Sequence, residues 1–409
     1  MTPTTILAVN GVLYLVLLIY SILKKRGKLG ILLTAVYTTI AVGSVYFTKD
    51  EPSRTQGILM WPFFYYFLIY IILIAPFNRN KRFHERIVVP NTNVMNTVCD
   101  VFIVVSILYI IALSDKLLIA LRSGNWLFVY VQMRSEDAVF HESFYEQVLI
   151  NVTTYLRIPI VFYSLYVFAY RIPYKRRYLA LVFPLVNSVV WAIYTASRTE
   201  FVVIGFIYLG CYYLCSSKFA GSFKRKITVI GSIFAVIGSI FIIAISASRF
   251  GEGETSWLVD YFGDSFVVAN HMIAFTDRIG NGSYFFKQIF SILNIHVAPF
   301  HCRIDDGTAF HSLIGMRYSD FGPIGTIIYA FIGLLWMNYL QKKKQILIGD
   351  VYLIMYYFIV LLIGVFYDSA TAYSWLIVIV ASFILNKISV RNVKVKSHSV
   401  LSSAVSTGR

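Results

Sequence analysis

Residues 296–325 gather the side chains best suited to acid–base and anion-binding chemistry in this sequence. The stretch holds three of the seven histidines, two arginines and three aspartates, namely His296, His301, His311, Arg303, Arg317, Asp305, Asp306 and Asp320. A histidine titrates near pH ~6.5 and can act as a base in neutral solution, while an arginine can hold an anion. The stretch is therefore the predicted chemical centre of the chain.

The elements that must position this stretch are membrane helices. The chain is 58% hydrophobic, 17% aromatic and only 14% charged, and its mean hydropathy of +0.70 excludes an ordinary soluble domain. We expect an all-α polytopic membrane protein that forms a single integral membrane domain over residues 1–409, with about eleven transmembrane helices. The apolar windows lie at 4–23, 29–47, 58–77, 98–114, 148–170, 178–196, 200–216, 227–247, 322–340, 349–366 and 373–387.

The basic residues predict the orientation. Two thirds of the 36 lysines and arginines fall in alternate connections and in the tail at 388–409, which the positive-inside rule places in the cytoplasm. The amino terminus is then outside, and two large loops at about 115–147 and 248–321 are exterior. The net charge of +16 is accounted for by this topology, so nucleic acid is not an expected partner.

Two segments resemble a known superfamily. His311-Ser312, nine residues and then Gly322-Pro323-Ile324-Gly325 resemble the His-[Asn/Ser/Gln]-x9-Gly-x-x-[Gly/Thr/Tyr] pattern of the O-antigen ligase and polymerase superfamily. The segment Ala196-Ser197-Arg198-Thr199-Glu200-Phe201 is similar to an arginine segment of Wzy-type repeat-unit polymerases.

The resemblance implies a bundle of the GT-C type in the bacterial inner membrane, with the two large loops in the periplasm. Its members join oligosaccharides carried on undecaprenyl diphosphate in the biosynthesis of lipopolysaccharide and related surface polysaccharides. A sugar hydroxyl attacks the anomeric carbon of the donor, and lipid diphosphate leaves. The expected partners are undecaprenyl-diphosphate-linked oligosaccharide and membrane lipid. A chain-length regulator protein is a further candidate partner.

This chemistry needs a base and cations. His311 is the first candidate base and His301 the second. Asp320 can orient a histidine or bind an acceptor hydroxyl, although capping of the following membrane helix is the simpler interpretation.

Four exterior arginines are candidates for holding the diphosphate, because the planar guanidinium binds phosphate oxygens in pairs. They are Arg198, Arg249, Arg303 and Arg317. Each can equally contact lipid phosphate at the membrane edge. Asp305-Asp306 can hold a divalent ion, but before Gly307 the pair first indicates a turn. No metal site and no cofactor are therefore expected.

Two other functions remain open. An O-antigen ligase shares the histidine pattern but transfers finished polymer to the lipid A core, and only the Arg198 segment favours a polymerase over it. A flippase or transporter of lipid-linked oligosaccharide would need essential charges within its spans, where Arg157 is the main ionisable residue.

Overall fold

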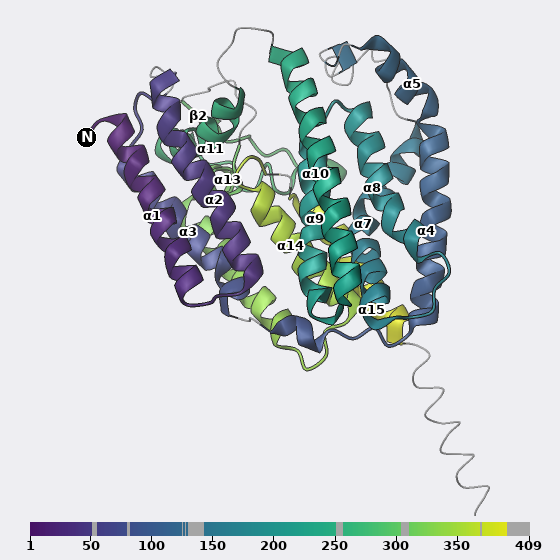
Figure 1. Cartoon of the computed structure of the whole chain (residues 1–409). Coiled ribbons are helices and arrows are strands. Elements are labelled where there is room, and N and C mark those ends of the chain that lie inside the picture. The colour runs from purple at the N-terminus through teal and green to yellow at the C-terminus, as the bar shows by residue number, and fades with distance from the viewer. Residues whose placement is uncertain are drawn as a thin grey trace, which may run out of the picture. The chain divides into compact units, whose positions relative to one another are not determined.

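The computed structural model is almost entirely helical (Figure 1). It describes residues 1–50, 55–79, 82–124, 126, 128–129, 143–250, 257–303, 311–368 and 370–390. The chain falls into two compact units. Unit 1 comprises Met1–Arg86, Gly253–Lys344 and Tyr356–Ile379, and unit 2 comprises Ile87–Glu252, Gln345–Met355 and Val380–Arg409.

Unit 1 is built from the first part of the sequence and from two later segments. Its helices are α1 (Pro3–Leu23), α2 (Lys28–Asp50), α3 (Met60–Arg79), the short 3-10 helix η1 (Phe83–Arg86), α11 (Trp257–Phe275), α12 (Lys287–Ile292) and α13 (Leu313–Lys342). The strands β1 (Thr276–Arg278) and β2 (His301–Cys302) form a small antiparallel ladder. Helix α2 packs against α1 and α3, and α3 packs against α13.

Helix α11 is the main feature of unit 1 that the hydropathy windows did not predict. It packs against α2, α3 and α13, and residues 263–273 are all buried. The side-chain amide of Asn270 forms two hydrogen bonds with the backbone of Leu59, at 3.0 and 2.7 Å. The part of the chain predicted as one exterior loop at 248–321 therefore contains a buried helix that holds the start of α3.

Unit 2 contains the middle of the sequence. Its helices are α4 (Thr92–Ala112), α5 (Ser114–Ser123), α7 (Phe144–Tyr170), α8 (Arg177–Tyr194), α9 (Thr199–Cys215), the short η2 (Ser216–Lys218) and α10 (Gly221–Phe250). Helix α7 packs against α4, α8 and α9. Helices α14 (Ile348–Ile363) and α15 (Ala372–Val390) each have residues in both units. In the predicted loop at 115–147, α5 follows α4 directly, while residues 130–142 lie outside the described residues.

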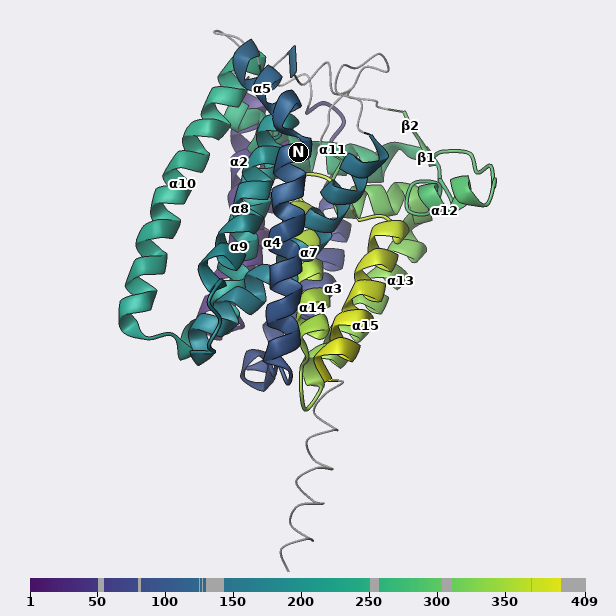
Figure 2. The same ribbon diagram turned by 90° about the vertical axis from the view of Figure 1, so that its right-hand side faces the viewer.

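Helix α10 has the least protein around it of the ten candidate spans (Figure 2). Only 6% of its apolar window is buried, and its exposed side chains include Ile230, Val236 and Ile240, at 64%, 61% and 60%. A helix that is apolar and exposed over most of its surface is suited to lipid rather than to water. Helix α10 therefore supports the membrane assignment independently of composition.

The predicted fold class is confirmed. Among the described residues, ten helices are long and apolar enough to span a membrane, and α14 is a shorter apolar helix. Each of the eleven predicted windows coincides with one of these helices. The predicted orientation, the GT-C type and the single membrane domain over 1–409 stay predictions.

Helix α13 is broken at Gly322. This residue has φ 71° and ψ −179°, a conformation that is essentially restricted to glycine. Pro323 follows it, and proline is well suited to the first turn of a helix because that turn needs no partner for its N–H. The break divides α13 into a short helix at 313–321 and a long membrane helix that begins at Pro323.

We predict that Gly322→Ala destabilises the protein by about 1–3 kcal/mol, since alanine disfavours this backbone conformation. The added Cβ would also lie 2.7 Å from Cδ1 of Ile279. The measurement is the thermal unfolding of purified protein in lipid nanodiscs. Gly231→Ala in α10 is the matched control, because a Cβ there meets nothing within 4 Å and alanine favours helix. Equal unfolding temperatures for the two variants would contradict the prediction.

Candidate functional site

The candidate site is organised by the short helix at 313–321. Ser312 caps it, and its side-chain oxygen accepts a hydrogen bond from the N–H of Gly315 at 3.2 Å. Gly322 ends it with the left-handed φ described above. The nine residues between Ser312 and Gly322 make about two and a half helical turns. The fixed spacing of the His-Ser-x9-Gly pattern therefore corresponds to the length of one short helix between a cap and a break.

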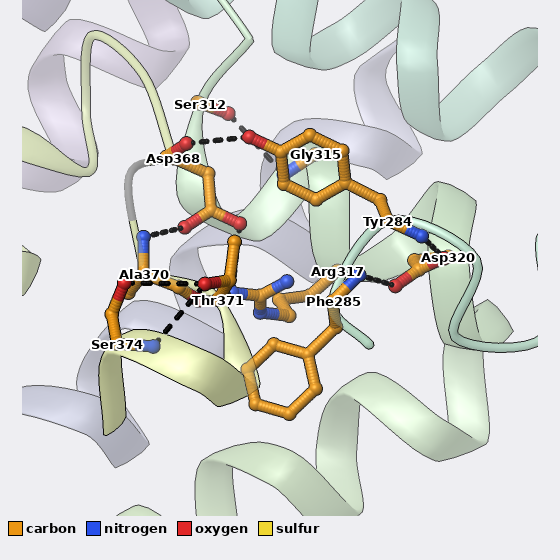
Figure 3. A network of polar contacts seen from close by, with 10 residues as sticks. All are labelled: Tyr284, Phe285, Ser312, Gly315, Arg317, Asp320, Asp368, Ala370, Thr371 and Ser374. Carbon is orange, nitrogen blue, oxygen red and sulfur yellow. Dashed lines mark hydrogen bonds and ion pairs between the residues drawn. The ribbon is translucent and has the colours of Figure 1, made fainter. Parts of the chain in front are cut away.

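Arg317 lies on this short helix and is fully buried (Figure 3). Its Nη2 lies 2.8 Å from Oδ2 of Asp368 in an ion pair, and the same nitrogen donates to the carbonyl oxygen of Ala370. A guanidinium stays charged in any protein environment, so a buried arginine requires an anionic partner. Asp368 supplies that charge from the connection between α14 and α15.

Two aromatic rings flank the Arg317 guanidinium. Its central carbon lies 4.4 Å from the ring centre of Phe285 and 5.0 Å from that of Tyr329. Neither Nε nor Nη1 has a hydrogen-bond partner of good geometry among the described residues. Cation–π attraction to the two rings therefore helps to stabilise the charge, and this attraction is stronger where water is excluded.

Asp320 holds the connection that leads to α12. Its two carboxylate oxygens accept hydrogen bonds from the backbone N–H groups of Tyr284 at 3.0 Å and Phe285 at 2.9 Å, and Ser283 donates its hydroxyl at 3.4 Å. The side chain is fully buried. The capping interpretation is therefore wrong: the Asp320 carboxylate binds backbone donors of the connection before α12, not those of the membrane helix that begins at Pro323.

Three segments meet around Asp320 and Asp368. The hydroxyl of Tyr284 donates to the carbonyl oxygen of Asp368 at 2.8 Å, and the N–H of Asp368 donates to the carbonyl oxygen of His311 at 2.8 Å. The N–H of Ala372 donates to the carbonyl oxygen of Phe285 at 2.8 Å. The connection around 284–285, the start of α13 and the connection before α15 are thus joined by backbone hydrogen bonds.

Burial raises the pKa of the Asp368 carboxyl to about 6, and the positive charge of Arg317 limits the increase. Asp368 is therefore mostly ionised at neutral pH and takes up a proton in mildly acidic solution. The ion pair with Arg317 depends on pH for this reason.

A second group of charged side chains lies on the β1–β2 ladder. Oδ1 of Asp277 lies 2.8 Å from Nδ1 of His301, and Oδ2 lies 3.3 Å from Nε of Arg303. The hydrogen bond to His301, reinforced by Arg303, lowers the pKa of Asp277. The histidine side chain is 59% exposed and the arginine side chain is 72% exposed. The carboxylate orients an accessible imidazole, which is the arrangement of a general base and its orienting acid.

The other predicted residues are distributed as follows. His311 is exposed at the start of α13, and Arg198 is 6% exposed immediately before α9 in unit 2. The backbone of Arg249 belongs to α10, but its side chain and the Asp305-Asp306 pair lie outside the described residues. Within unit 1, the structure thus brings His301 and Arg303 together through Asp277, and it pairs Arg317 with Asp368.

Asp277, Asp368 and Phe285 were not singled out from the sequence. Asp368 stands 51 positions from Arg317, and no local pattern links them. The position of Asp368 between two apolar windows is nevertheless a usable signal, because a carboxylate that is buried there requires a partner.

Comparisons with models of protein families, with curated proteins and with solved structures gave no match.

We predict that Arg317→Met makes stability depend on pH above about pH 6. Loss of the cation raises the pKa of Asp368 further. A carboxyl with a raised native pKa stabilises the fold below its unfolded pKa, and this contribution is lost as the pH rises to the native value. In the wild type the loss levels off within about one pH unit above the native pKa of about 6. In the variant it continues to higher pH, by at most about 1.4 kcal/mol per pH unit.

Thermal unfolding of both proteins between about pH 6 and 8 measures this difference. The control is the double variant Arg317→Met, Asp368→Asn, which lacks the titrating carboxyl and should lose the added pH dependence. An Arg317→Met protein with the same pH profile as the wild type would show that Asp368 is not coupled to Arg317.

Proposed function

We propose that this chain is a membrane glycosyltransferase of the repeat-unit polymerase type. It transfers a glycan from polyprenyl diphosphate to a lipid-linked acceptor at the outer face of the bacterial inner membrane. The observation that carries the proposal is the Asp277–His301 pair with Arg303 beside it, in the segment that leads to the His311-Ser312 motif. A base and a cation are the two groups that this transfer requires.

In the proposed reaction, Nε2 of His301 removes the proton from an acceptor hydroxyl. The oxygen attacks the anomeric carbon of the donor, the bond between that carbon and the diphosphate oxygen breaks, and polyprenyl diphosphate leaves with the electron pair. Asp277 holds the imidazole through Nδ1 and stabilises the positive charge that it gains. Because the leaving group is a diphosphate, no general acid is needed to protonate it.

The arginines divide into two roles in this proposal. Arg303 is exposed and can turn its guanidinium toward the diphosphate. Arg317 is fully buried and engaged with Asp368, so its support for the reaction is positional. It fixes the connections around 284–285 and 368–370 next to the motif. Arg198 and Arg249 stay candidates for contact with the diphosphate.

His311 is the second candidate base, on the strength of the motif. The structure relates the two histidines indirectly. The β1–β2 ladder that carries His301 is joined to α13, which follows His311, by the hydrogen bond between the hydroxyls of Thr276 and Ser319 at 2.8 Å. Separate substitution distinguishes them.

We predict that His301→Ala lowers transfer by roughly 10²–10⁴-fold, the usual contribution of a general base. The assay uses purified protein, a lipid-diphosphate repeat unit, and product analysis with and without a chelator. Asp277→Asn should reduce activity less and change the pH profile, because it weakens the orientation of the ring without removing it. His296→Ala, an exposed histidine of the same segment, is the matched control.

Three outcomes would contradict parts of this proposal. Full activity of His301→Ala together with loss of activity in His311→Ala would move the base to His311. Transfer of finished polymer to a lipid A core acceptor, with no lengthening of repeat units, would indicate the ligase. Movement of intact lipid-linked oligosaccharide without bond formation would indicate a transporter.

A further inference from the structure

The connection between β1 and β2 carries an apolar cluster that the proposed reaction does not use. It consists of Ile292, Leu293 and Ile295, at and just after the end of α12, and is called the α12 tip below. These side chains are between 46% and 71% exposed. An apolar side chain exposed singly is ordinary on a protein surface, whereas a group of them on one short segment marks a contact surface.

The turn that ends α12 pairs its carbonyl groups internally. Asn294 has a φ of 53°. Its N–H donates to the carbonyl oxygen of Ser291 at 3.3 Å, and the N–H of Ile295 donates to that of Phe290 at 2.8 Å. These two bonds form a Schellman motif. Because unpaired backbone groups are costly in lipid, such a helix end is suited to a segment that enters a membrane.

The connection is fixed at the level where the membrane part of α13 begins. The N–H of Gly280 donates to the carbonyl oxygen of Ser319 at 3.0 Å, and the N–H of Gly282 donates to that of Asp320 at 3.1 Å. Both acceptors lie just before Pro323, the first residue of the long membrane helix. Figure 2 shows α12 at the edge of the helices, level with this part of α13.

Apolar side chains lead from α13 to the tip. The ring centre of Phe286 lies 6.2 Å from that of Phe321 and 5.6 Å from that of Phe290. Beyond the break, exposed apolar side chains of α13 recur at intervals of three and four residues, which places them on one helix face. They are Ile324, Ile328, Phe331 and Leu335. The tip therefore continues a surface that is suited to lipid.

The polar side chains of the connection suit lipid headgroups. Gln288, Ser291 and Asn294 recur every third residue, so they lie on a different side of α12 from the tip. Residues 279–303 contain two basic residues and no acidic one. Of these, Lys287 is exposed at the start of α12, where a lysine can reach a phosphate while its stem lies on apolar surface. This charge favours phospholipid over a protein partner as the occupant.

We infer that the α12 tip inserts into the lipid leaflet that surrounds the start of the membrane part of α13. The depth is that of an interfacial helix, about 5–10 Å into the boundary between headgroups and acyl chains. The tip lies between β1 and β2, so its insertion holds Asp277 and His301 close to headgroup level. The diphosphate of a lipid-linked donor lies at the same level, and this last step rests on the proposed function.

Spin labels on the full-length protein in lipid nanodiscs test the insertion. Leu293→Cys carries the label in a Cys302→Ser background, because the other three native cysteines are buried. Oxygen concentrates in lipid and a nickel chelate stays in water, so collisions with each reagent report the surroundings of the label. We expect the label at position 293 to collide with oxygen and to lose most of its contact with nickel.

Two reference positions in unit 1 calibrate the result. Ile332→Cys, at an exposed apolar position of α13, reports lipid. Lys344→Cys, at an exposed position just after α13, reports water. The inference is overturned if the label at position 293 contacts nickel as the Lys344→Cys label does. It is also overturned if that label contacts neither reagent, because protein, such as a second copy of the chain, then covers the tip.

A pair of matched variants tests whether apolar surface causes the insertion. Ile292→Asp with Ile295→Asp should restore nickel contact at position 293, because carboxylates are costly in lipid. Ile292→Val with Ile295→Val should not change it. Unchanged nickel contact in a folded aspartate variant would overturn the inference. Thermal unfolding identifies a variant that does not fold, and the label on the otherwise unchanged tip then decides alone.

The collision measurement needs no glycan donor, so it separates the two proposals. Full glycan transfer by a protein whose tip lies in water would remove only this inference. A tip in lipid without any transfer would remove only the proposed polymerase.

Discussion

The site in unit 1 depends on a charge that cannot be removed. The guanidinium of Arg317 is fully buried in a helical unit, and it stays protonated at any pH that the protein meets. Its positive charge is stabilised by the carboxylate of Asp368 at 2.8 Å, one backbone carbonyl and two aromatic rings. Every segment that supplies one of these groups is thereby confined to a small region around the short helix at 313–321.

Two buried carboxylates, those of Asp320 and Asp368, lie in that region and stabilise different segments. The carboxylate of Asp320 accepts hydrogen bonds from two backbone N–H groups. Asp368 has one backbone donor, from Ala370 at 3.0 Å, and one cation. The first therefore secures the shape of the connection before α12, and the second ties the connection before α15 to Arg317. Because the two carboxylates have different partners, they can lie in the same region without competing for one cation.

Much of the fold could be predicted from the sequence, because the windows that became helices are apolar over their whole length. Helix α11 was missed for the same physical reason: Asp264, Asn270 and His271 lower its hydropathy, although all three are buried against protein. The spacing of the His-Ser-x9-Gly pattern could be read but not explained without the cap at Ser312 and the break at Gly322. The partners of Arg317 and His301 could not be found, since Asp368 and Asp277 are brought to them by tertiary folding alone.

Helix α10 has a consequence for the isolated molecule. It packs against α9 over a small area and presents most of its surface outward, so hydrocarbon chains complete the packing that the polypeptide leaves undone. A detergent micelle replaces those chains with a smaller and more mobile shell. The position of α10 then depends on the detergent or lipid around it as well as on its contacts with protein. Retained lipid therefore acts as a structural component of unit 2.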